Sequence, residues 1–213
     1  EISCSLVGSE MCIRDSINCM YLCSEVSKMR VITGSARGRR LIAPDGLDVR
    51  PTTDKVKEGI FSALQFELEN TYVLDLFAGS GQMGIEALSR GASRCVFVDS
   101  SQRSIRAIND NLRTTKLEKY SEVINRDSYD YIKHTARSFD IIILDPPYRH
   151  NHIDNILPFA AAKLNDGGFI VCEYEKEADE PAVPEGLVLR KTYKYGKISV
   201  TILCKSFPED EEE

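Results

Sequence analysis

Short β-branched runs alternate with helix-like stretches along the chain from residue 72 onward. This alternation is typical of βαβ units wound around a mostly parallel sheet. The run Ile141-Ile142-Ile143-Leu144 is apolar at successive positions, which indicates a strand covered on both faces at the centre of such a sheet. The pattern predicts seven strands, at residues 72–76, 94–99, 122–125, 139–145, 168–174, 187–193 and 198–204.

Helices are expected between these strands, at about 82–90, 101–115, 128–137 and 152–164, with Gly91 and Gly167 as helix stops. The last two strands are joined only by residues 194–197. This link is too short for a parallel crossover, so these strands should form an antiparallel hairpin. The expected fold class is α/β, with a Rossmann-like, seven-stranded, mostly parallel sheet that ends in an antiparallel hairpin.

A basic segment precedes this sheet. Residues 31–42 predict a short hairpin around Gly34 and Gly38, and a helix should begin at Thr53 or Asp54. Apolar residues recur with helical spacing on one face of that helix, at Val56, Ile60, Phe61, Leu64 and Leu68.

The chain is therefore expected to have four segments: a leader at 1–28, a basic extension at 29–70, an α/β domain at 71–206 and an acidic disordered tail at 207–213. The leader should be non-native or disordered. Its stretch VGSEMCIRDS at 7–16 resembles translated adapter or cloning sequence, and Met29 resembles a natural start.

The formal net charge of −6 conceals an uneven distribution. Two of the 27 bases and nine of the 33 acids lie in the leader or the tail, which leaves 25 bases against 24 acids between them. Residues 29–57 carry seven bases and three acids, so this segment could face a phosphate backbone.

Cysteine and histidine usage argues against a metal site. Four of the seven cysteines lie in the first 23 residues, without a C-x-x-C pair or a nearby histidine. Cys95, Cys172 and Cys204 lie in apolar runs and are expected to be reduced core residues, as in a cytoplasmic protein. No run approaches the length of a membrane span, and residues 1–28 lack the pattern of a signal peptide.

A glycine loop, DLFAGSGQMG at 75–84, contains the G-x-G-x-x-G fingerprint between a strand and a helix. Gly79 and Gly81 can take positive φ, and Gly84 allows the helix to approach the strand. Asp99 follows Gly79 by 20 residues and could accept hydrogen bonds from ribose hydroxyls. These features alone leave an NAD site open.

Asp75 favours a different cofactor. A carboxylate beside the loop would repel a pyrophosphate at the helix N-terminus but would attract a cation. S-adenosylmethionine carries a sulfonium and an ammonium group and has no phosphate. The loop is similar to the first motif of class I S-adenosylmethionine-dependent methyltransferases, which implies cofactor-binding roles for Asp75, Phe77, Gly79, Gly81, Asp99, Ser100, Asp127 and Ser128. For Asp127, a helix N-cap is the structural alternative, and the two roles are compatible.

The sequence Asp145-Pro146-Pro147-Tyr148 ends the most apolar strand, where ligands bind in open α/β sheets. The Asp145 carboxylate and the Pro146 carbonyl could accept the two hydrogens of a nucleobase amine, a contact that strengthens as the nitrogen gains positive charge. Pro147 fixes φ, and Tyr148 could stack on the base. The tetrapeptide resembles the fourth motif of methyltransferases that act on nucleobase amino groups.

Further blocks extend the resemblance over about residues 29–205. They are R-V-I-T-G-S-A-R-G-R-R-L at 30–41, R-P-T-T-D-K-V-K-E-G-I-F at 50–61, A-L-S-R-G-A at 87–92 and Y-G-K at 195–197. With the two motifs above they resemble the RsmD family, which implies methylation of guanine N2 in 16S ribosomal RNA. Gln82-Met83 and Ile198-Ser199 depart from the residues expected in that family, away from the proposed chemistry.

The resemblance implies that the partner is 16S rRNA or an assembling small subunit. We expect a cytoplasmic protein, a monomer, and a reaction that needs no metal. RNA-binding roles are expected for Arg37, Arg39, Arg40, Arg50, Thr52, Thr53, Lys55 and Lys57, against the alternative of a solvated basic face. Three other functions stay open: an adenine-N6 methyltransferase on DNA or RNA, an NAD-dependent oxidoreductase, and a noncatalytic RNA-binding scaffold.

Overall fold

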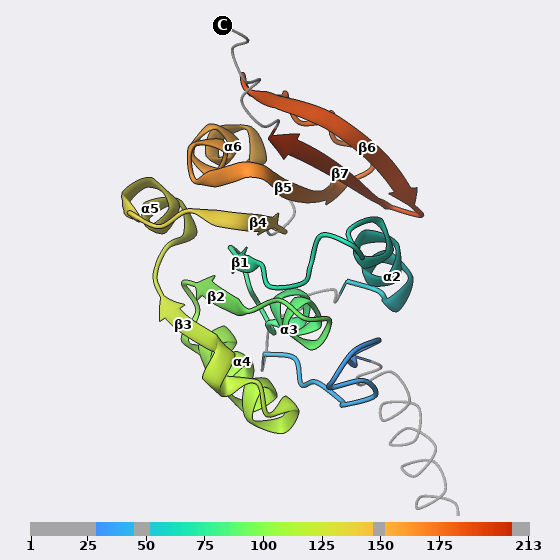
Figure 1. The fold of residues 1–213 in the computed structure, drawn as a ribbon, viewed down its shortest axis with the longest axis vertical. Helices are drawn as coiled ribbons and strands as arrows, with labels where there is room; N and C mark the ends of the chain where they lie inside the picture. Colours follow the sequence, from blue (N-terminus) through green and yellow to red (C-terminus); the bar gives the residue numbers. More distant parts are fainter. Residues whose placement is uncertain (1–28, 45–51, 147–151, 206–213) are drawn as a thin grey trace, which may run out of the picture.

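The structure, a computed structural model, describes residues 29–44, 52–146 and 152–205. One seven-stranded sheet, in the order β3-β2-β1-β4-β5-β7-β6, forms its centre (Figure 1). The first five strands are parallel, and β7 pairs antiparallel with both β5 and β6. The strands are β1 Tyr72–Asp75, β2 Arg94–Asp99, β3 Ser121–Asn125, β4 Phe139–Leu144, β5 Leu164–Glu175, β6 Leu187–Tyr195 and β7 Ile198–Lys205. The predicted fold class is confirmed.

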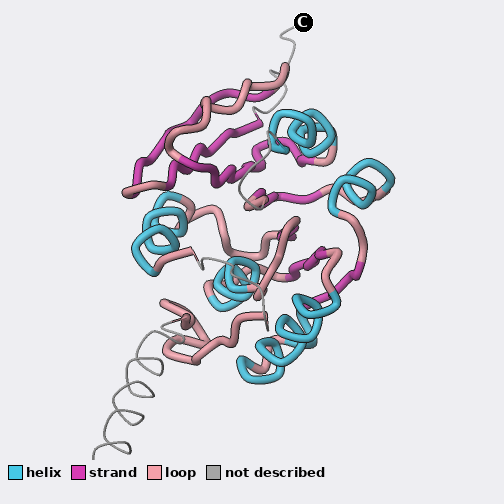
Figure 2. Tube along the Cα trace, turned by 180° about the vertical axis from the view of Figure 1, so that it is seen from behind, coloured by secondary structure: helices cyan, strands magenta, loops and turns pink. Residues whose placement is uncertain are grey.

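Helices cover both faces of the sheet. Successive strand residues point to opposite faces, and apolar side chains on each face pack against helices. Figure 2 shows α5 and α6 on one side of the strands and α2 and α3 on the other. Val73 and Ile143 pack with α2, α3 and α4, whereas Leu74 and Leu144 pack with α5 and α6. The helices are α2 Asp54–Ala63, α3 Gln82–Ser89, α4 Gln102–Thr115, α5 Ser128–His134 and α6 His152–Ala162, with a 3₁₀ turn at Glu118–Tyr120.

Gly167 corrects the sequence prediction. It was expected to stop the helix that precedes β5, but α6 ends at Ala162 and Gly167 lies inside β5 with φ of 72°. Leu164 already pairs with Phe139, and the register between the two strands shifts before the next pair. The positive φ of Gly167 therefore lies where the pairing of β5 with β4 changes register. Gly91, the other predicted stop, does follow α3 and has φ of 115°.

The basic extension folds back onto α3. Its hairpin contains one isolated bridge, between Arg30 and Arg40, with the turn at 33–38 between them. The Glu86 carboxylate on α3 accepts the backbone N–H groups of Ile32 and Thr33, at 2.7 and 3.0 Å. Gly34 lies so close to α3 that a Cβ there would be 1.8 Å from the Ser89 carbonyl oxygen. These contacts hold the hairpin against α3, the helix that follows the glycine loop.

Two sequence-predicted segments, the leader at 1–28 and the tail at 207–213, lie outside the described residues. Within the described part of the chain, no helix is both long and apolar enough to cross a membrane.

Candidate active site

Three carboxyl side chains share one face of the sheet at the carboxyl ends of neighbouring strands. Asp75 ends β1, Asp145 directly follows β4, and Glu173 lies near the end of β5. Leu144 of β4 pairs with Cys172 of β5, so Asp145 and Glu173 follow that pair side by side. Asp75 and Asp145 line one small hollow with Phe77, Ala78, Ser80, Gln82 and Met83 of the glycine loop and Met29, Ala43 and Pro44 of the extension.

The glycine loop has the geometry that its sequence predicts. Gly79 and Gly81 have φ of 54° and 75°. A Cβ on Gly84 would lie 2.4 Å from the Phe97 ring and 2.7 Å from Cys95 Sγ, so this glycine lets α3 pack closely against β2. The helix that follows the loop therefore stays tight against the sheet.

Asp75 is placed to meet a cation. It is 2% exposed, and its Oδ2 accepts the backbone N–H of Gly84 at 2.9 Å. Burial raises the pKa of Asp75 to about 7, the Gly84 hydrogen bond opposes this shift, and the charges of Asp145 and Asp99 add to it. A positive ligand group in the hollow would favour the ionised carboxylate, whereas a pyrophosphate would not.

Asp99 organises the turn after β2. Its Oδ2 accepts the backbone N–H of Gly79 at 2.9 Å, and its Oδ1 accepts that of Ser101 at 2.8 Å. The carboxylate therefore joins the glycine loop to the start of α4. Its predicted contact with ribose remains a prediction, as does the role of the exposed Ser100.

Asp127 caps α5, because its Oδ1 accepts the backbone N–H of Asp130 at 2.9 Å. Asp127 is therefore a helix N-cap, the structural alternative that the sequence also predicts. Asp127 is exposed and Ser128 is buried, and a cofactor contact by either residue remains a prediction.

Asp145 lies between the extension and β5. The Thr52 hydroxyl is 3.3 Å from Asp145 Oδ2 and also 3.3 Å from Glu173 Oε2. Burial raises the pKa of Asp145 to about 6, and the Thr52 hydrogen bond opposes that shift. Pro146 is buried beside it, while Pro147 and Tyr148 lie outside the described residues.

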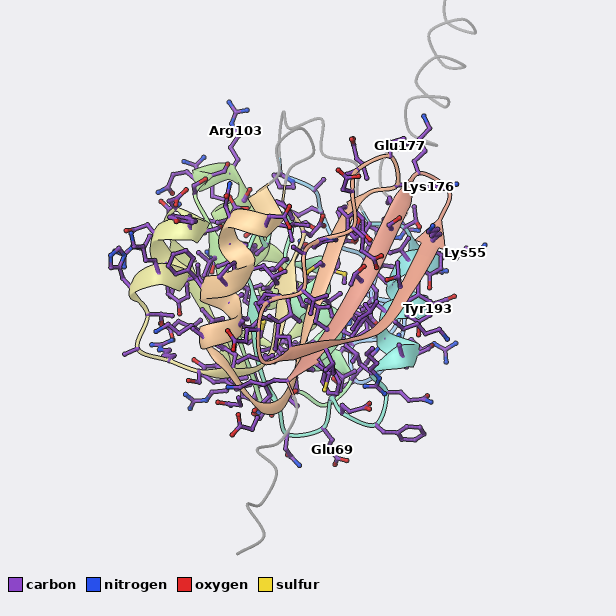
Figure 3. All side chains as sticks on the ribbon, turned by 90° about the horizontal axis from the view of Figure 1, so that it is seen from above. Lys55, Glu69, Arg103, Lys176, Glu177 and Tyr193 are labelled. Atoms are coloured by element: carbon purple, nitrogen blue, oxygen red, sulfur yellow. The ribbon has the colours of Figure 1, made fainter. Side chains whose placement is uncertain are left out.

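The predicted RNA-binding residues divide into exposed and buried sets. Figure 3 shows Lys55 pointing outward from α2. Arg37, Arg39, Arg40 and Thr53 are also exposed, and Arg50 lies outside the described residues. RNA binding by the exposed set remains a prediction.

Lys57 and Thr52 form the buried set. Lys57 is 0% exposed, and its Nζ donates to the Arg30 carbonyl at 2.7 Å and lies 3.6 Å from Asp54 Oδ1. Burial lowers the pKa of Lys57. Thr52 is 4% exposed and faces the two carboxyl groups. Neither side chain presents a surface to RNA in this structure: Lys57 contacts Arg30 and Asp54 inside the extension, and Thr52 faces carboxyl groups of the α/β domain.

Sequence reasoning missed Glu86, Asn111 and Glu173. Asn111 of α4 is buried, accepts the Ile42 N–H at 2.8 Å and donates to the Ser80 carbonyl at 2.8 Å. Glu173 interrupts the apolar run Phe169-Ile-Val-Cys-Glu-Tyr, and an acid inside a buried strand was the available signal. Glu86 gave a weaker signal, since its i,i+4 spacing to Arg90 predicts that ion pair alone and does not indicate the backbone partners Ile32 and Thr33.

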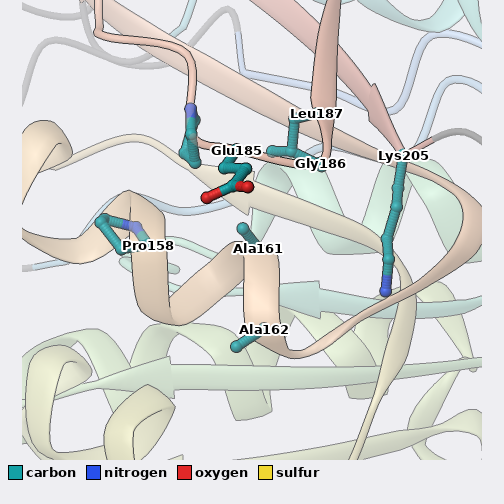
Figure 4. A pocket seen from close by; sticks show the side chains of 8 residues that line it. Pro158, Ala161, Ala162, Glu185, Gly186, Leu187 and Lys205 are labelled. Atoms are coloured by element: carbon teal, nitrogen blue, oxygen red, sulfur yellow. The ribbon is translucent and has the colours of Figure 1, made fainter.

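A second hollow, of about 320 Å³, lies beside α6 (Figure 4). Its charged members are Glu185 and Lys205, and Lys205 Nζ donates to the carbonyl of Leu164, the first residue of β5. It therefore lies at the opposite end of β5 from Glu173. Among the described residues no cluster of His, Cys, Asp and Glu could hold a metal ion.

Comparison with known proteins places the chain in a family. The family model described as "Conserved hypothetical protein 95" matches residues 29–204. A Bacillus subtilis relative named "Putative rRNA methyltransferase YlbH" is 41% identical over 83% of this chain and 99% of its own length. "Ribosomal RNA small subunit methyltransferase D" of Haemophilus influenzae is 35% identical over 81% of this chain and 91% of its own length.

Solved structures with a similar fold support the same family assignment. The structure titled "Putative methyltransferase yhhF from Escherichia coli" has a TM-score of 0.77 at 29% identity, and the match covers 84% of this chain and 98% of that one. The structure titled "putative methylase HI0767 from Haemophilus influenzae" has a TM-score of 0.70 at 32% identity, and the match covers 84% of this chain and 99% of that one. The chain belongs to the Conserved hypothetical protein 95 family, the RsmD family of ribosomal RNA methyltransferases.

Proposed function

We propose that the protein transfers a methyl group from S-adenosylmethionine to the exocyclic N2 of a guanine in 16S ribosomal RNA. The supporting observation is that Asp75 and Asp145 face one hollow from neighbouring strand ends. One carboxylate beside the glycine loop suits a cationic methyl donor. The other begins the tetrapeptide suited to an amine acceptor.

Asp75, the glycine loop and Asp99 would hold S-adenosylmethionine, which supplies an electrophilic methyl group on a sulfonium. The Gly84 N–H fixes the Asp75 carboxylate at the loop, so its charge is already oriented when a cation enters. Asp99 holds Gly79 in its positive-φ conformation and is placed at the turn where ribose hydroxyls bind in this fold class.

Asp145 and Pro146 would act on the guanine. An exocyclic amine is a poor nucleophile because its lone pair is delocalised into the ring. When the Asp145 carboxylate and the Pro146 carbonyl each accept one amine hydrogen, the nitrogen becomes pyramidal and its lone pair is released. These hydrogen bonds strengthen as the nitrogen becomes positive, so they stabilise the transition state more than the bound substrate.

The basic extension would hold the RNA. Arg37, Arg39, Arg40 and Lys55 are exposed, and guanidinium groups bind phosphate with two parallel hydrogen bonds. A base edge in an A-form helix is poorly accessible, so the target guanine should lie in a loop or be displaced from its stack. The relatives named as ribosomal RNA methyltransferases support this substrate class, and we place the reaction in the cytoplasm.

The test is methyl transfer to small ribosomal subunits that lack the modification, followed by mass spectrometry of nucleosides and mapping of the position. The proposal expects N2-methylguanosine at one position and a loss of at least about 100-fold in kcat for Asp145→Ala. Full activity of that variant would refute the role of Asp145. N6-methyladenosine would instead support the adenine alternative, and calorimetric binding of NAD but not S-adenosylmethionine would support an oxidoreductase.

A further inference from the structure

Gln82, the first residue of α3, lines the hollow that also contains Asp75 and Asp145. The sequence predicts that this residue, a departure from the RsmD pattern, lies away from the chemistry, and the structure corrects that prediction. Gln82 is 7% exposed, and its Oε1 is buried without a hydrogen-bond partner among the described residues. A buried amide oxygen without a partner costs stability, so a ligand that supplies a donor explains why this residue is found here.

The other polar side chains that line the hollow already have partners in the protein. These pairs are Asp75 with the Gly84 N–H at 2.9 Å, Ser80 with Met29 Sδ at 3.2 Å, and Asp145 with the Thr52 hydroxyl at 3.3 Å. Gln82 is therefore the side chain of this set whose oxygen is left for a group that enters the hollow.

The hollow offers acceptors and negative charge to that group. Asp75 and Gln82 are both acceptors, and none of the described residues that line the hollow has a cationic side chain. An ammonium group carries one positive charge and has three N–H donors. Asp75 can accept one of them and offset the charge, and Gln82 Oε1 can accept another. A ribose hydroxyl fits less well, since its expected partner Asp99 does not line the hollow.

The side chain of Gln82 can turn toward a ligand without loss of a hydrogen bond at Oε1, because that atom makes none within the described part of the chain. The backbone beside it is held in place. The Ser80 carbonyl accepts from Asn111 Nδ2 at 2.8 Å, and the Gly81 N–H donates to the Ala78 carbonyl at 2.6 Å. The amide can therefore adjust while the glycine loop keeps its conformation.

We propose that Gln82 is a cofactor-binding residue whose side-chain oxygen accepts a hydrogen bond from the α-ammonium group of S-adenosylmethionine. This inference rests on the proposed binding of the cofactor beside Asp75. It adds a contact to the amino-acid end of the cofactor. Because Gln82 departs from the family pattern, the contact belongs to this chain and not to the shared motif.

Calorimetric titration with three ligands tests the contact. S-adenosylmethionine and its decarboxylated form both carry the ammonium group, whereas 5′-methylthioadenosine lacks the whole amino-acid end. Gln82→Met keeps the length of the side chain and removes the amide. It should weaken binding of the first two ligands by about 10- to 100-fold, as expected for a hydrogen bond to a charged group, and binding of the third by less than about threefold. Gln82→Ala should repeat this pattern, which separates loss of the amide from the fit of Met.

Three results would overturn the proposal. Equal weakening for all three ligands would show no contact with the ammonium group. Weakening for S-adenosylmethionine but not for its decarboxylated form would place the contact at the carboxylate instead. Unchanged affinity of both variants for S-adenosylmethionine would show that Gln82 does not contact the cofactor.

Urea denaturation without ligand tests whether Gln82 has a partner in the protein. Gln82→Met removes a buried oxygen that makes no hydrogen bond, so its denaturation midpoint should equal or exceed that of wild type. A clear fall in the midpoint for both Gln82→Met and Gln82→Ala would contradict the proposal. Ser89→Ala is the matched control on α3, because buried Ser89 accepts the Ala36 N–H at 2.9 Å and donates to the Thr33 carbonyl at 2.6 Å. It should lower the midpoint and leave the relative affinities for the three ligands unchanged.

The wild-type protein separates this inference from the proposed function. If wild type binds no S-adenosylmethionine, both fail. If it binds the cofactor but transfers no methyl group to guanine, the proposed reaction fails while the ligand comparison still tests Gln82. If it binds the cofactor and methylates guanine, and the Gln82 variants bind all three ligands as wild type does, this inference alone fails.

Discussion

The Glu86 carboxylate, buried on α3, accepts the backbone N–H of Ile32 at 2.7 Å and thereby ties the basic extension to the glycine-loop helix. The same side chain accepts the N–H of Thr33 and the guanidinium of Arg90, at 3.0 and 2.7 Å. One side chain thus satisfies three donors from two parts of the chain.

Glu86→Ala should therefore lower the free energy of unfolding by about 3 to 5 kcal/mol, because it leaves buried donors and a cation without their partner. Urea denaturation measures this loss, and limited proteolysis should cut the 29–44 segment faster. Asp110→Ala, which breaks an exposed ion pair with Arg113, should cost under about 1 kcal/mol. Equal losses in the two variants would contradict the anchoring role of Glu86.

Lys55 and Lys57 lie two residues apart on α2, and their replacement by Ala should affect different properties: RNA binding for Lys55 and stability for Lys57. Lys57→Ala leaves the Arg30 carbonyl without its donor and opens a gap in the core, so it should lower the free energy of unfolding by about 2 to 4 kcal/mol. Lys55→Ala should leave stability within about 0.5 kcal/mol and weaken RNA binding, with a smaller dependence of affinity on salt. Thermal denaturation and RNA titration at two salt concentrations measure both effects. A stable Lys57→Ala variant with weakened RNA binding would restore the original prediction from the sequence.

The sheet could be predicted from the sequence because its strands are short, apolar and rich in β-branched residues. Strand β2 occupies 94–99 as predicted, and most other strands differ by one or two residues at their ends. Strand β5 begins at Leu164 instead of 168, since its first pairing with Phe139 precedes the apolar run. Gly167 was misassigned for the same reason: glycine signals a positive φ but does not say which element contains it.

The site was predictable only where a motif determines the backbone. Gly79, Gly81 and Gly84 occupy the predicted conformations because the turn itself requires them. The burial of Lys57 was not predicted because its charge was weighed without its position on the helix. It shares a helical face with Ile60 and Phe61, both buried. The partners of Thr52 could not be predicted, since Glu173 lies 121 residues away and the contact depends on how the extension folds back.

Gly84→Ala should separate α3 from β2. Its new Cβ would meet the Phe97 ring at 2.4 Å and Cys95 Sγ at 2.7 Å, and both neighbours are buried in the core. We expect a loss of about 1 to 3 kcal/mol, the usual cost of inserting an atom into a packed core. Phe97→Leu should recover part of that loss in the double variant by making room beside the helix. Calorimetric unfolding of the single and double variants measures the coupling, and strict additivity would argue against this contact as the cause.

Asp75 predicts a pH dependence of both stability and cofactor binding. Its folded-state pKa is about 7, above the ordinary 3.8, because burial disfavours the charge. A carboxyl with a raised folded pKa stabilises the fold at low pH, and this contribution is lost as pH rises toward and through about 7. Asp75→Asn keeps an oxygen that can accept the Gly84 N–H and removes the ionisation. Without ligand, the variant should therefore gain stability relative to wild type between pH 4 and 8, by at most about 4 kcal/mol.

Cofactor binding should be stronger at high pH, whereas the Asp75 contribution to folding stability is greater at low pH. A cationic ligand needs the ionised carboxylate, so wild-type affinity for S-adenosylmethionine should fall as pH drops below about 7, by at most about tenfold per pH unit, with proton release on binding. Asp75→Asn should bind at least about tenfold more weakly at pH 8 and lose the part of this pH dependence that comes from Asp75. Calorimetry in buffers of different ionisation enthalpy measures affinity and proton release together. Wild-type affinity in the variant at pH 8, where wild-type Asp75 is ionised, would show that this carboxylate does not hold the cationic group of the cofactor.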